Sequence, residues 1–353
     1  MNYYAGLDVS MKETFICVVD RDGNIILEGQ VQTEPEEIAS FLKQADVPIK
    51  KVAIESGSLT HWLVTELQKH KIPAICVDAR HMSSMLAMKV NKTDTNDARG
   101  IANALRGGYV REVNIKSQYH IEVGILLQSR GVLVQERTKL KNAIRGFLKA
   151  FGIKVSTSGF TSFIKEVRKS IEKRSIEVKK AIEALLNAIE AINEEIKGLE
   201  ERVQQIGKDN KDAQLLMTIP GVGILTALHF VVAIGDYTRF NDSRKVAAYL
   251  GLTPRQYSSG ESQRLGRISK CGSRETRSML VEAATVMLTR TRSWCKPKAW
   301  AMKLQRKKGF KKATVALGRK LAVIMHRMLV TKEPFYFGEE PGKTTSKKLE
   351  KAA

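Results

Sequence analysis

The feature of this sequence that most restricts its fold is a regular row of apolar residues between positions 178 and 206. Successive members are spaced alternately four and three residues apart over four heptads. This spacing places the row on one side of an α-helix with Glu and Lys beside it, so it predicts a coiled coil. The row consists of Val178, Ile182, Leu185, Ile189, Ile192, Ile196, Leu199, Val203 and Ile206.

We expect this helix to run from about residue 162 to residue 206. Its seam either folds back on a preceding helix or joins two subunits, and the charged exterior favours subunit joining. The preceding helix is predicted over residues 121–151 and is rich in cations. Its cationic side suits the backbone of RNA or DNA, and the alternative is a solvated face with weak intrahelical pairs. The cations concerned are Arg130, Arg137, Lys141 and Arg145.

The N-terminal third predicts an α/β domain. Three consecutive strands are followed by alternating helices and strands, which is the order expected of a ribonuclease-H-like sheet. The expected strands cover residues 2–9, 14–20, 25–32, 51–55 and 72–77, with helices over 35–44 and 61–70.

Four acids stand at the ends of these elements. Asp8 and Glu55 each close an apolar strand, and Asp94 and Asp97 open a helix on which a spacing of three puts both carboxylates on one face. Singly, each could be a turn acid, or a helix N-cap in the case of Asp94. Together they suit two divalent ions about 4 Å apart, which clamp both sides of a phosphoryl displacement. Oxygen ligands of this kind favour Mg²⁺.

The charge of the chain predicts its partner. The formal net charge is +22 and the pI is about 9.8, so we expect a polyanion, with nucleic acid favoured over an anionic membrane. No apolar run approaches the roughly 18 residues of a spanning helix, and no signal-peptide pattern begins the chain, so we expect a soluble intracellular protein. The four cysteines lack C-x-x-C spacing and predict neither a zinc site nor a disulfide framework.

The last third contains a glycine-rich turn between two apolar helical runs. Residues 219–223 (IPGVG) predict a helix-hairpin-helix in which Gly221 and Gly223 let a phosphate approach backbone N–H groups. A plain turn between two helices is the alternative.

A later stretch, residues 254–260 (PRQYSSG), places two adjacent hydroxyls among cations in a loop marked by Gly and Pro. A serine nucleophile that attacks a phosphate needs such a hydroxyl with cations beside it. The alternative is a basic loop that only binds a nucleic-acid backbone. A helix is expected from residue 272 to residue 289. The remaining predicted phosphate contacts are Lys12, Lys92, Arg255, Arg264, Arg267, Lys270, Arg274 and Arg277.

Several of these segments resemble the signature of the DEDD insertion-sequence transposases, which are bridge-RNA-guided recombinases related to the pilin-gene DNA inverters. The first-domain motifs are residues 6–10 (GLDVS), 54–57 (IESG) and 92–99 (KTDTNDAR). Residues 250–260 (LGLTPRQYSSG) resemble the second catalytic motif, which residues 264–277 (RLGRISKCGSRETR) continue. The resemblance runs from about residue 3 to residue 330.

The resemblance implies an N-terminal RuvC-like domain, a helical coiled-coil insertion and a mainly α C-terminal transposase domain. It implies that Asp8, Glu55, Asp94 and Asp97 bind Mg²⁺ and that the serine before the glycine, Ser259, is the nucleophile. Ser258 beside it is a local rival. It further implies a noncoding guide RNA that pairs with donor and target DNA, dimers that assemble into tetramers, and a place in the prokaryotic cytoplasm at the nucleoid.

We therefore expect four segments: residues 1–112 as the RuvC-like domain, 113–209 for dimerisation and RNA contact, 210–332 with the catalytic serine, and 333–353 as a mobile basic tail. The expected activity is DNA strand transfer through a covalent phosphoserine. The alternatives are a metal-dependent nuclease acting on junctions or RNA–DNA hybrids, and a non-enzymatic architectural nucleic-acid-binding protein.

Overall fold

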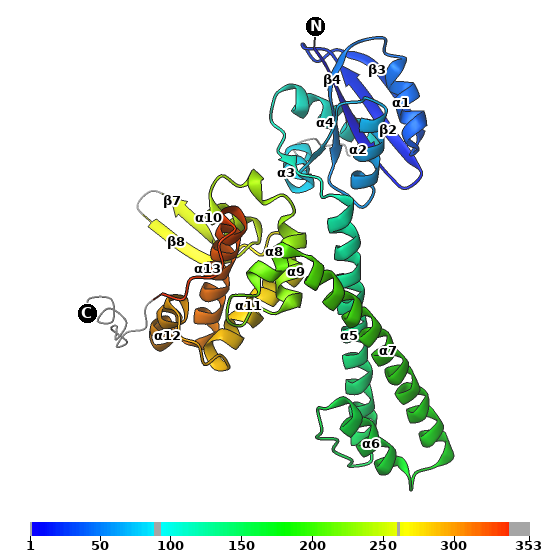
Figure 1. The fold of residues 1–353 in the computed structure, drawn as a ribbon. Helices are drawn as coiled ribbons and strands as arrows, with labels where there is room; N and C mark the ends of the chain where they lie inside the picture. Colours follow the sequence, from blue (N-terminus) through cyan, green and yellow to red (C-terminus); the bar gives the residue numbers. More distant parts are fainter. Residues whose placement is uncertain (1, 88–92, 260–261, 339–353) are drawn as a thin grey trace, which may run out of the picture. The chain divides into compact units, whose positions relative to one another are not determined.

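The computed structural model describes residues 2–87, 93–259 and 262–338. The chain divides into two compact units, residues 1–116 and residues 117–353 (Figure 1). A search of the described helices finds none that is both long and apolar enough to cross a membrane.

The first unit is built on a six-stranded sheet with the order β3-β2-β1-β4-β5-β6. Strands β1 to β3 form an antiparallel meander, β4 and β5 run parallel to β1, and the short β6 is antiparallel to β5. This confirms the predicted ribonuclease-H-like order. The strands are β1 (Tyr3–Val9), β2 (Glu13–Val19), β3 (Ile25–Gln32), β4 (Ile49–Glu55), β5 (Ala74–Val77) and β6 (Glu112–Val113).

Helices cover both faces of this sheet, because alternate strand residues point to opposite faces. Leu7 and Ile54 pack with the apolar sides of α1 and α2 on one face. On the other face, Val19 and Cys17 pack against Ala98 and Ala102 of α4. The helices of this unit are α1 (Pro35–Lys43), α2 (Thr60–Lys69), α3 (Ala79–Leu86) and α4 (Asp94–Arg106).

The second unit begins with three helices, α5 (Gln118–Lys149), α6 (Phe160–Ile171) and α7 (Ile176–Asp209). The prediction of one helix over residues 162–206 is wrong, because the chain leaves the helix after Ile171 and starts a new one. The hydroxyl of Ser175 accepts a hydrogen bond from the N–H of Val178 and caps the start of α7.

The predicted apolar seam packs within the chain. Figure 1 shows α7 running beside α5, with α6 at one end of the pair. Ile182, Ile189, Ile196 and Val203 are buried, as the spacing predicts. These four residues therefore pack within the chain, as the fold-back alternative predicts, and a role of the region in joining subunits stays a prediction.

The buried side of α7 is also rotated relative to the predicted row. Leu186 and Asn193 are buried, whereas Leu185 and Ile192 are only half-buried. A polar contact between the helices lies on this rotated side: the guanidinium of Arg137 on α5 donates to Oδ1 of Asn193 at 2.6 Å. A buried amide that has a partner is tolerated in a helix interface.

The remainder of the second unit is mainly helical around an apolar core. The largely buried α9 lies at its centre and packs against α11, while α13 packs against α11 and α12. The elements are α8 (Lys211–Leu216), α9 (Ile224–Ile234), η1 (Tyr237–Arg239), α10 (Ser243–Tyr249), β7 (Pro254–Ser259), β8 (Ser262–Ile268), α11 (Arg274–Thr289), α12 (Lys296–Lys308) and α13 (Phe310–Thr331).

Two expectations for this part need correction. The stretch expected to be a loop after residue 254 is a two-stranded antiparallel hairpin, β7–β8. The tail expected to be mobile from residue 333 onward is anchored near its start. Phe335 is buried and its N–H donates to Oγ1 of Thr218 at 3.0 Å. Residues 339–353 lie outside the described part of the chain.

Candidate active site

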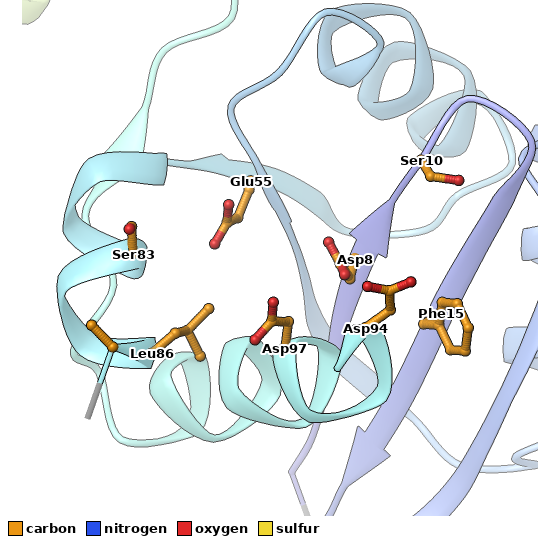
Figure 2. Close-up of a pocket in the computed structure, with 9 residues that line it drawn as sticks. Asp8, Ser10, Phe15, Glu55, Ser83, Leu86, Asp94 and Asp97 are labelled. Carbon is orange, nitrogen blue, oxygen red and sulfur yellow. The ribbon is translucent and has the colours of Figure 1, made fainter. Parts of the chain in front are cut away.

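The four predicted acids line one cavity of about 490 Å³ in the first unit. Asp8 comes from β1, Glu55 from the end of β4, and Asp94 and Asp97 from the first turn of α4. Figure 2 shows the four carboxylates directed into the same space. The cavity is completed by Ser10, Phe15, Ser83, Leu86 and Ala87, none of which was predicted as a site residue.

Strand register brings Asp8 and Glu55 together. Strands β1 and β4 are parallel neighbours, and Leu7 pairs with Ile54. The next residue on each strand is an acid, so both carboxylates emerge at the same edge of the sheet. This edge, at the carboxyl ends of parallel strands, is where sites of α/β domains usually form.

Close packing of α4 on β1 brings in the other two acids. A side chain at Gly6 would place its Cβ 2.3 Å from the backbone nitrogen of Ala102 and 2.4 Å from the carbonyl oxygen of Ala98. The absence of a side chain at Gly6 therefore allows the helix to lie against the strand. Asp94 is one turn before Ala98, so this contact also fixes where the helix begins relative to the strand.

Asp94 is the first residue of α4 and not its N-cap. The cap is Thr93, whose hydroxyl accepts a hydrogen bond from the N–H of Asn96 at 3.2 Å. The capping alternative for Asp94 is therefore wrong. Asp94 is exposed and Asp97 half-buried, and both carboxylates are available to the cavity.

Asp8 and Glu55 also line a second cavity, of about 280 Å³, on the side of the loop that precedes α2. Thr60 fixes this loop, since its hydroxyl donates to the carbonyl of Glu55 at 2.5 Å and accepts from the N–H of Gly57 at 2.8 Å. The exposed Met11 lines the same hollow. The two carboxylates therefore stand between two adjoining spaces.

Four carboxylates around one cavity supply the hard oxygen ligands that divalent cations such as Mg²⁺ or Mn²⁺ prefer. The donor chemistry thus fits a divalent metal. In the described ranges, no three Asp, Glu, His or Cys side chains stand close enough together to hold an ion as they are arranged. Which acids bind the metal therefore stays a prediction. Lys12 is exposed in the turn after β1, and Lys92 lies outside the described residues.

The predicted serine stretch lies at the end of the β7–β8 hairpin in the second unit. Along its backbone, Ser258 pairs with Gln263 and Ser259 pairs with Ser262. The side chains of these four residues and all of Gly260 are outside what the structure describes.

A compact set of backbone hydrogen bonds holds the base of this hairpin. The N–H of Ser269 donates to the carbonyl of Thr253 at 2.8 Å, and the N–H of Lys270 donates to that of Gly251 at 3.0 Å. Gly251 has a φ of +69°, and a Cβ there would lie 2.2 Å from the carbonyl oxygen of Cys271. Only glycine fits both the conformation and the space.

The side chain of Arg277 adds hydrogen bonds at the same base. Its Nη1 donates to the carbonyl oxygens of Leu250, Cys271 and Gly272 at 3.2, 2.6 and 3.0 Å. Burial lowers the pKa of this guanidinium from its usual value. Arg277 was predicted to contact phosphate. In the structure its guanidinium is hydrogen-bonded to backbone carbonyls of the protein instead.

The other predicted cations near the hairpin are placed differently. Arg264, Arg267, Lys270 and Arg274 are exposed and available to a partner. Arg255 is also exposed and makes a long contact of 3.5 Å with the carbonyl of Ser269. A contact of that length is weak, so these five remain candidates for phosphate.

The predicted cations of α5 have internal partners. Arg130 pairs with Glu200 at 3.0 Å, and Arg137 binds Asn193. Lys141 donates to the carbonyl of Ser158 at 3.0 Å, and Arg145 to that of Thr157 at 2.9 Å. Burial, followed by the charges of Arg145 and Arg137, lowers the pKa of Lys141. These contacts hold α5 to the segments beside it, and the geometry adds no support for a phosphate-binding role.

The two glycines of the predicted helix-hairpin-helix differ. A Cβ at Gly221, where φ is +86°, would meet the carbonyl oxygen of Ala283 at 2.8 Å and the nitrogen of Met287 at 3.0 Å. Gly221 is therefore required for packing against α11. Gly223, at the start of α9, would meet no described atom within 4 Å, so its backbone is the one open to approach.

Comparison with known proteins identifies the family. Residues 5–153 match the model of the DEDD transposases of IS110 type, and residues 213–299 match that of the IS116/IS110/IS902 transposase family. The transposase of insertion sequence element IS1111A from Coxiella burnetii is 32% identical over 340 residues, covering 94% of this chain and 91% of the relative. A probable family 20 transposase from Pseudomonas aeruginosa is 27% identical over 329 residues, covering 92% and 96%.

The pilin gene-inverting protein of Moraxella bovis is 36% identical over 129 residues, which covers 36% of this chain and 39% of that protein. The DEDD domain implies a divalent metal ion, and a transposase implies binding to transposon DNA. These likenesses exclude a purely architectural role. The chain belongs to the IS110/IS1111 family of transposases, which cleave and transfer DNA strands.

Proposed function

We propose that this transposase is a site-specific recombinase of an insertion sequence, guided by a noncoding bridge RNA, that joins DNA strands through a covalent phosphoserine at Ser259. The observation that carries the proposal is the convergence of Asp8, Glu55, Asp94 and Asp97 on one cavity from β1, β4 and α4. Four carboxylates gathered in a chain of net charge +22 repel a phosphate unless a metal intervenes.

Asp8, Glu55, Asp94 and Asp97 would hold Mg²⁺, which when bound offsets charge on the scissile phosphate and on the leaving oxygen. The carboxylates position the phosphate by fixing that ion. The second cavity beside Asp8 and Glu55 provides room for the strand that continues from the scissile phosphate.

Ser259 performs the covalent step. Its Oγ loses a proton to solvent and bonds to phosphorus, while the bond from phosphorus to the leaving sugar oxygen breaks and that oxygen takes up a proton. The phosphoserine ester keeps the energy of the phosphodiester, so a hydroxyl of another strand can attack it and release the serine. Arg255, Arg264, Arg267 and Lys270 on or after the hairpin would bind the phosphate oxygens.

The chain is proposed to act as four segments: a RuvC-like domain (1–112), a helical region for dimerisation and RNA contact (113–209), a transposase domain (210–332) with a helix-hairpin-helix at α8–α9, and a basic tail (333–353). Dimers would pair into tetramers, so that acids of one subunit meet the serine of another.

The serine assignment is tested with a nicked substrate that traps the covalent adduct, analysed on a denaturing gel. Wild type and Ser258→Ala should form a protein–DNA adduct, whereas Ser259→Ala should not. An adduct that survives in Ser259→Ala and disappears in Ser258→Ala moves the nucleophile to the neighbouring serine.

The metal assignment is tested with Asp8→Asn, which preserves the shape of the side chain. Strand cleavage should fall by at least about 100-fold, since the loss of a ligand removes several kcal/mol of charge stabilisation. Binding of DNA in the presence of EDTA should be unchanged. Metal-dependent cleavage by Asp8→Asn at the wild-type rate would show that Asp8 is not a metal ligand.

The guide RNA is tested by purifying the full-length protein from its host and sequencing the RNA that remains bound. A discrete transcript from the DNA beside the gene, required for cleavage after reconstitution, is the expected result. Full activity after ribonuclease treatment contradicts guidance.

A second candidate is a metal-dependent nuclease acting on junctions or RNA–DNA hybrids, favoured by the fact that the acidic cavity is complete without the serine hairpin. Hydrolysis at equal rates in wild type and both serine variants, with no adduct, selects this alternative.

A further inference from the structure

The C-terminal helices carry an unusual share of the charge of the chain. Residues 296–331, which span α12 and α13, contain eleven Lys or Arg residues and no Asp or Glu. This segment is about a tenth of the chain and carries half of its formal net charge of +22. It lies almost entirely beyond residues 213–299, which the family model matches.

Five of these cations gather where α12 ends and α13 begins: Arg306, Lys307, Lys308, Lys311 and Lys312. Only Gly309 and Phe310 separate the two groups. Gly309, with a φ of +82°, turns the chain sharply, so the last turn of α12 and the first turn of α13 lie at the same corner of the unit. We call residues 306–312 the basic corner.

All five cations of the basic corner are exposed. None of them takes part in an ion pair with any acid in the described ranges. By comparison, Arg130 and Arg168 elsewhere in this unit are paired with glutamates. The acids of the described ranges therefore leave the charge of the basic corner unpaired.

The end of α13 adds to this charge. The helix is 22 residues long and no side chain caps its N-terminus. The first N–H groups of a helix carry partial positive charge and suit an anion. Five exposed cations therefore lie next to the uncapped N-terminus of α13.

We propose that the basic corner is a surface that binds the phosphate backbone of duplex DNA without regard to sequence. Duplex DNA presents one negative charge about every 1.7 Å along its axis, which matches a dense group of cations. Lysines contact phosphates as point charges and arginine as a bidentate donor, and neither contact carries sequence information by itself.

Single-stranded nucleic acid suits this surface less well. Sites for single strands rely on several open aromatic faces on which bases stack. Phe310 is the one aromatic residue within 306–312. The nearby Trp300 has the ammonium of Lys320 over its ring, 4.6 Å from the ring centre. The corner thus offers charge and little stacking surface.

This inference rests on the proposed function only in its premise that the transposase handles DNA, and not on the serine or the guide RNA. The test uses the full chain in EDTA, without RNA. Fluorescence anisotropy measures the affinity for a labelled duplex of unrelated sequence at salt concentrations from about 50 to about 300 mM. The steepness with which the affinity falls over this range reports how many phosphates the protein contacts. This affinity for DNA depends neither on the serine nor on the guide RNA. It is therefore unchanged if the proposals of a phosphoserine or of a guide RNA prove wrong.

The test variant changes all five cations of the corner to Gln. Its affinity for the duplex should fall roughly tenfold or more at about 150 mM salt. The slope of log K against log salt should become shallower by up to about 4.5, since each of five lost phosphate contacts removes about 0.9. The matched control changes five exposed lysines of α6, α7 and the segment between them to Gln: Lys165, Lys169, Lys173, Lys180 and Lys208.

The control removes the same charge and should change the affinity less than threefold. Equal losses in the two variants would show that total charge, and not the corner, governs binding, and the proposal would be wrong. A variant with Lys307, Lys308, Lys311 and Lys312 changed to Arg should keep the wild-type slope. A loss confined to a structured RNA or to single-stranded DNA, with duplex affinity intact, would also overturn the proposal.

Discussion

At the scale of single residues, Gly6 has more influence on the acidic site than its size suggests. Its missing side chain lets α4 lie on β1, and α4 carries Asp94 and Asp97. We predict that Gly6→Ala destabilises the first unit by about 1–3 kcal/mol, the usual cost of forcing a group into a packed interior. Cleavage should fall further than stability alone explains, because the two carboxylates move.

Thermal unfolding and single-turnover cleavage at a temperature where the variant is folded measure the two effects. The matched control is Gly131→Ala in the middle of α5, where a new Cβ meets no described atom within 4 Å. That change should be neutral or stabilise by up to about 1 kcal/mol, because alanine favours helix. Normal cleavage by folded Gly6→Ala would show that α4 is placed by other contacts.

At the scale of elements, the β7–β8 hairpin depends on Arg277 for the shape of its base. The guanidinium binds three carbonyls at the points where the chain enters and leaves the hairpin. We predict that Arg277→Met speeds amide hydrogen exchange of residues 254–268 by about 10- to 100-fold, since hydrogen bonds to a charged group contribute about 1.5–3 kcal/mol. Adduct formation should slow in parallel.

Exchange followed by mass spectrometry compares this variant with Arg274→Met, a neighbour on the same helix whose side chain is exposed. Arg274→Met should leave exchange in the hairpin unchanged and lower only DNA affinity. Unchanged exchange in Arg277→Met would mean that Gly251 and the paired N–H groups hold the hairpin without it.

The elements that the sequence predicts well are those with a strong local period. The strands of the first unit and the acids at their ends follow from apolar runs that stop at a carboxylate. The hairpin was missed because residues 254–268 are rich in Arg, Ser, Gln and Gly, which are typical of loops. The base of the hairpin is also held by Arg277 of α11, whose hydrogen bonds to Leu250, Cys271 and Gly272 no local pattern reveals.

The helical arm shows a different limit. A seam with heptad spacing has the same pattern whether it meets a helix of its own chain or of another. Asn193 reads as a surface residue, yet it is buried because Arg137, 56 residues earlier, donates to it. Spacing alone identified the helix but could not identify its partner.

At the scale of the whole molecule, the division into residues 1–116 and 117–353 predicts two separate unfolding events. Each unit has its own apolar core, and cores that do not depend on each other unfold independently. Differential scanning calorimetry of the full chain should resolve two transitions. Gly6→Ala, which disturbs only the first unit, should lower one of them by several degrees.

Gly221→Ala should lower the other transition. A Cβ at Gly221 would lie 2.8 Å from the carbonyl oxygen of Ala283, and alanine disfavours a φ of +86°. Gly223→Ala, two residues later in an open position, is the control. Its Cβ meets no described atom within 4 Å, so it should lower the second transition less than Gly221→Ala, by no more than the small cost of alanine at the N-cap of α9, and leave the first transition unchanged. If either Gly6→Ala or Gly221→Ala lowered both transitions together, the two units would unfold as one body, and the acids and the serine hairpin would share a single cooperative fold.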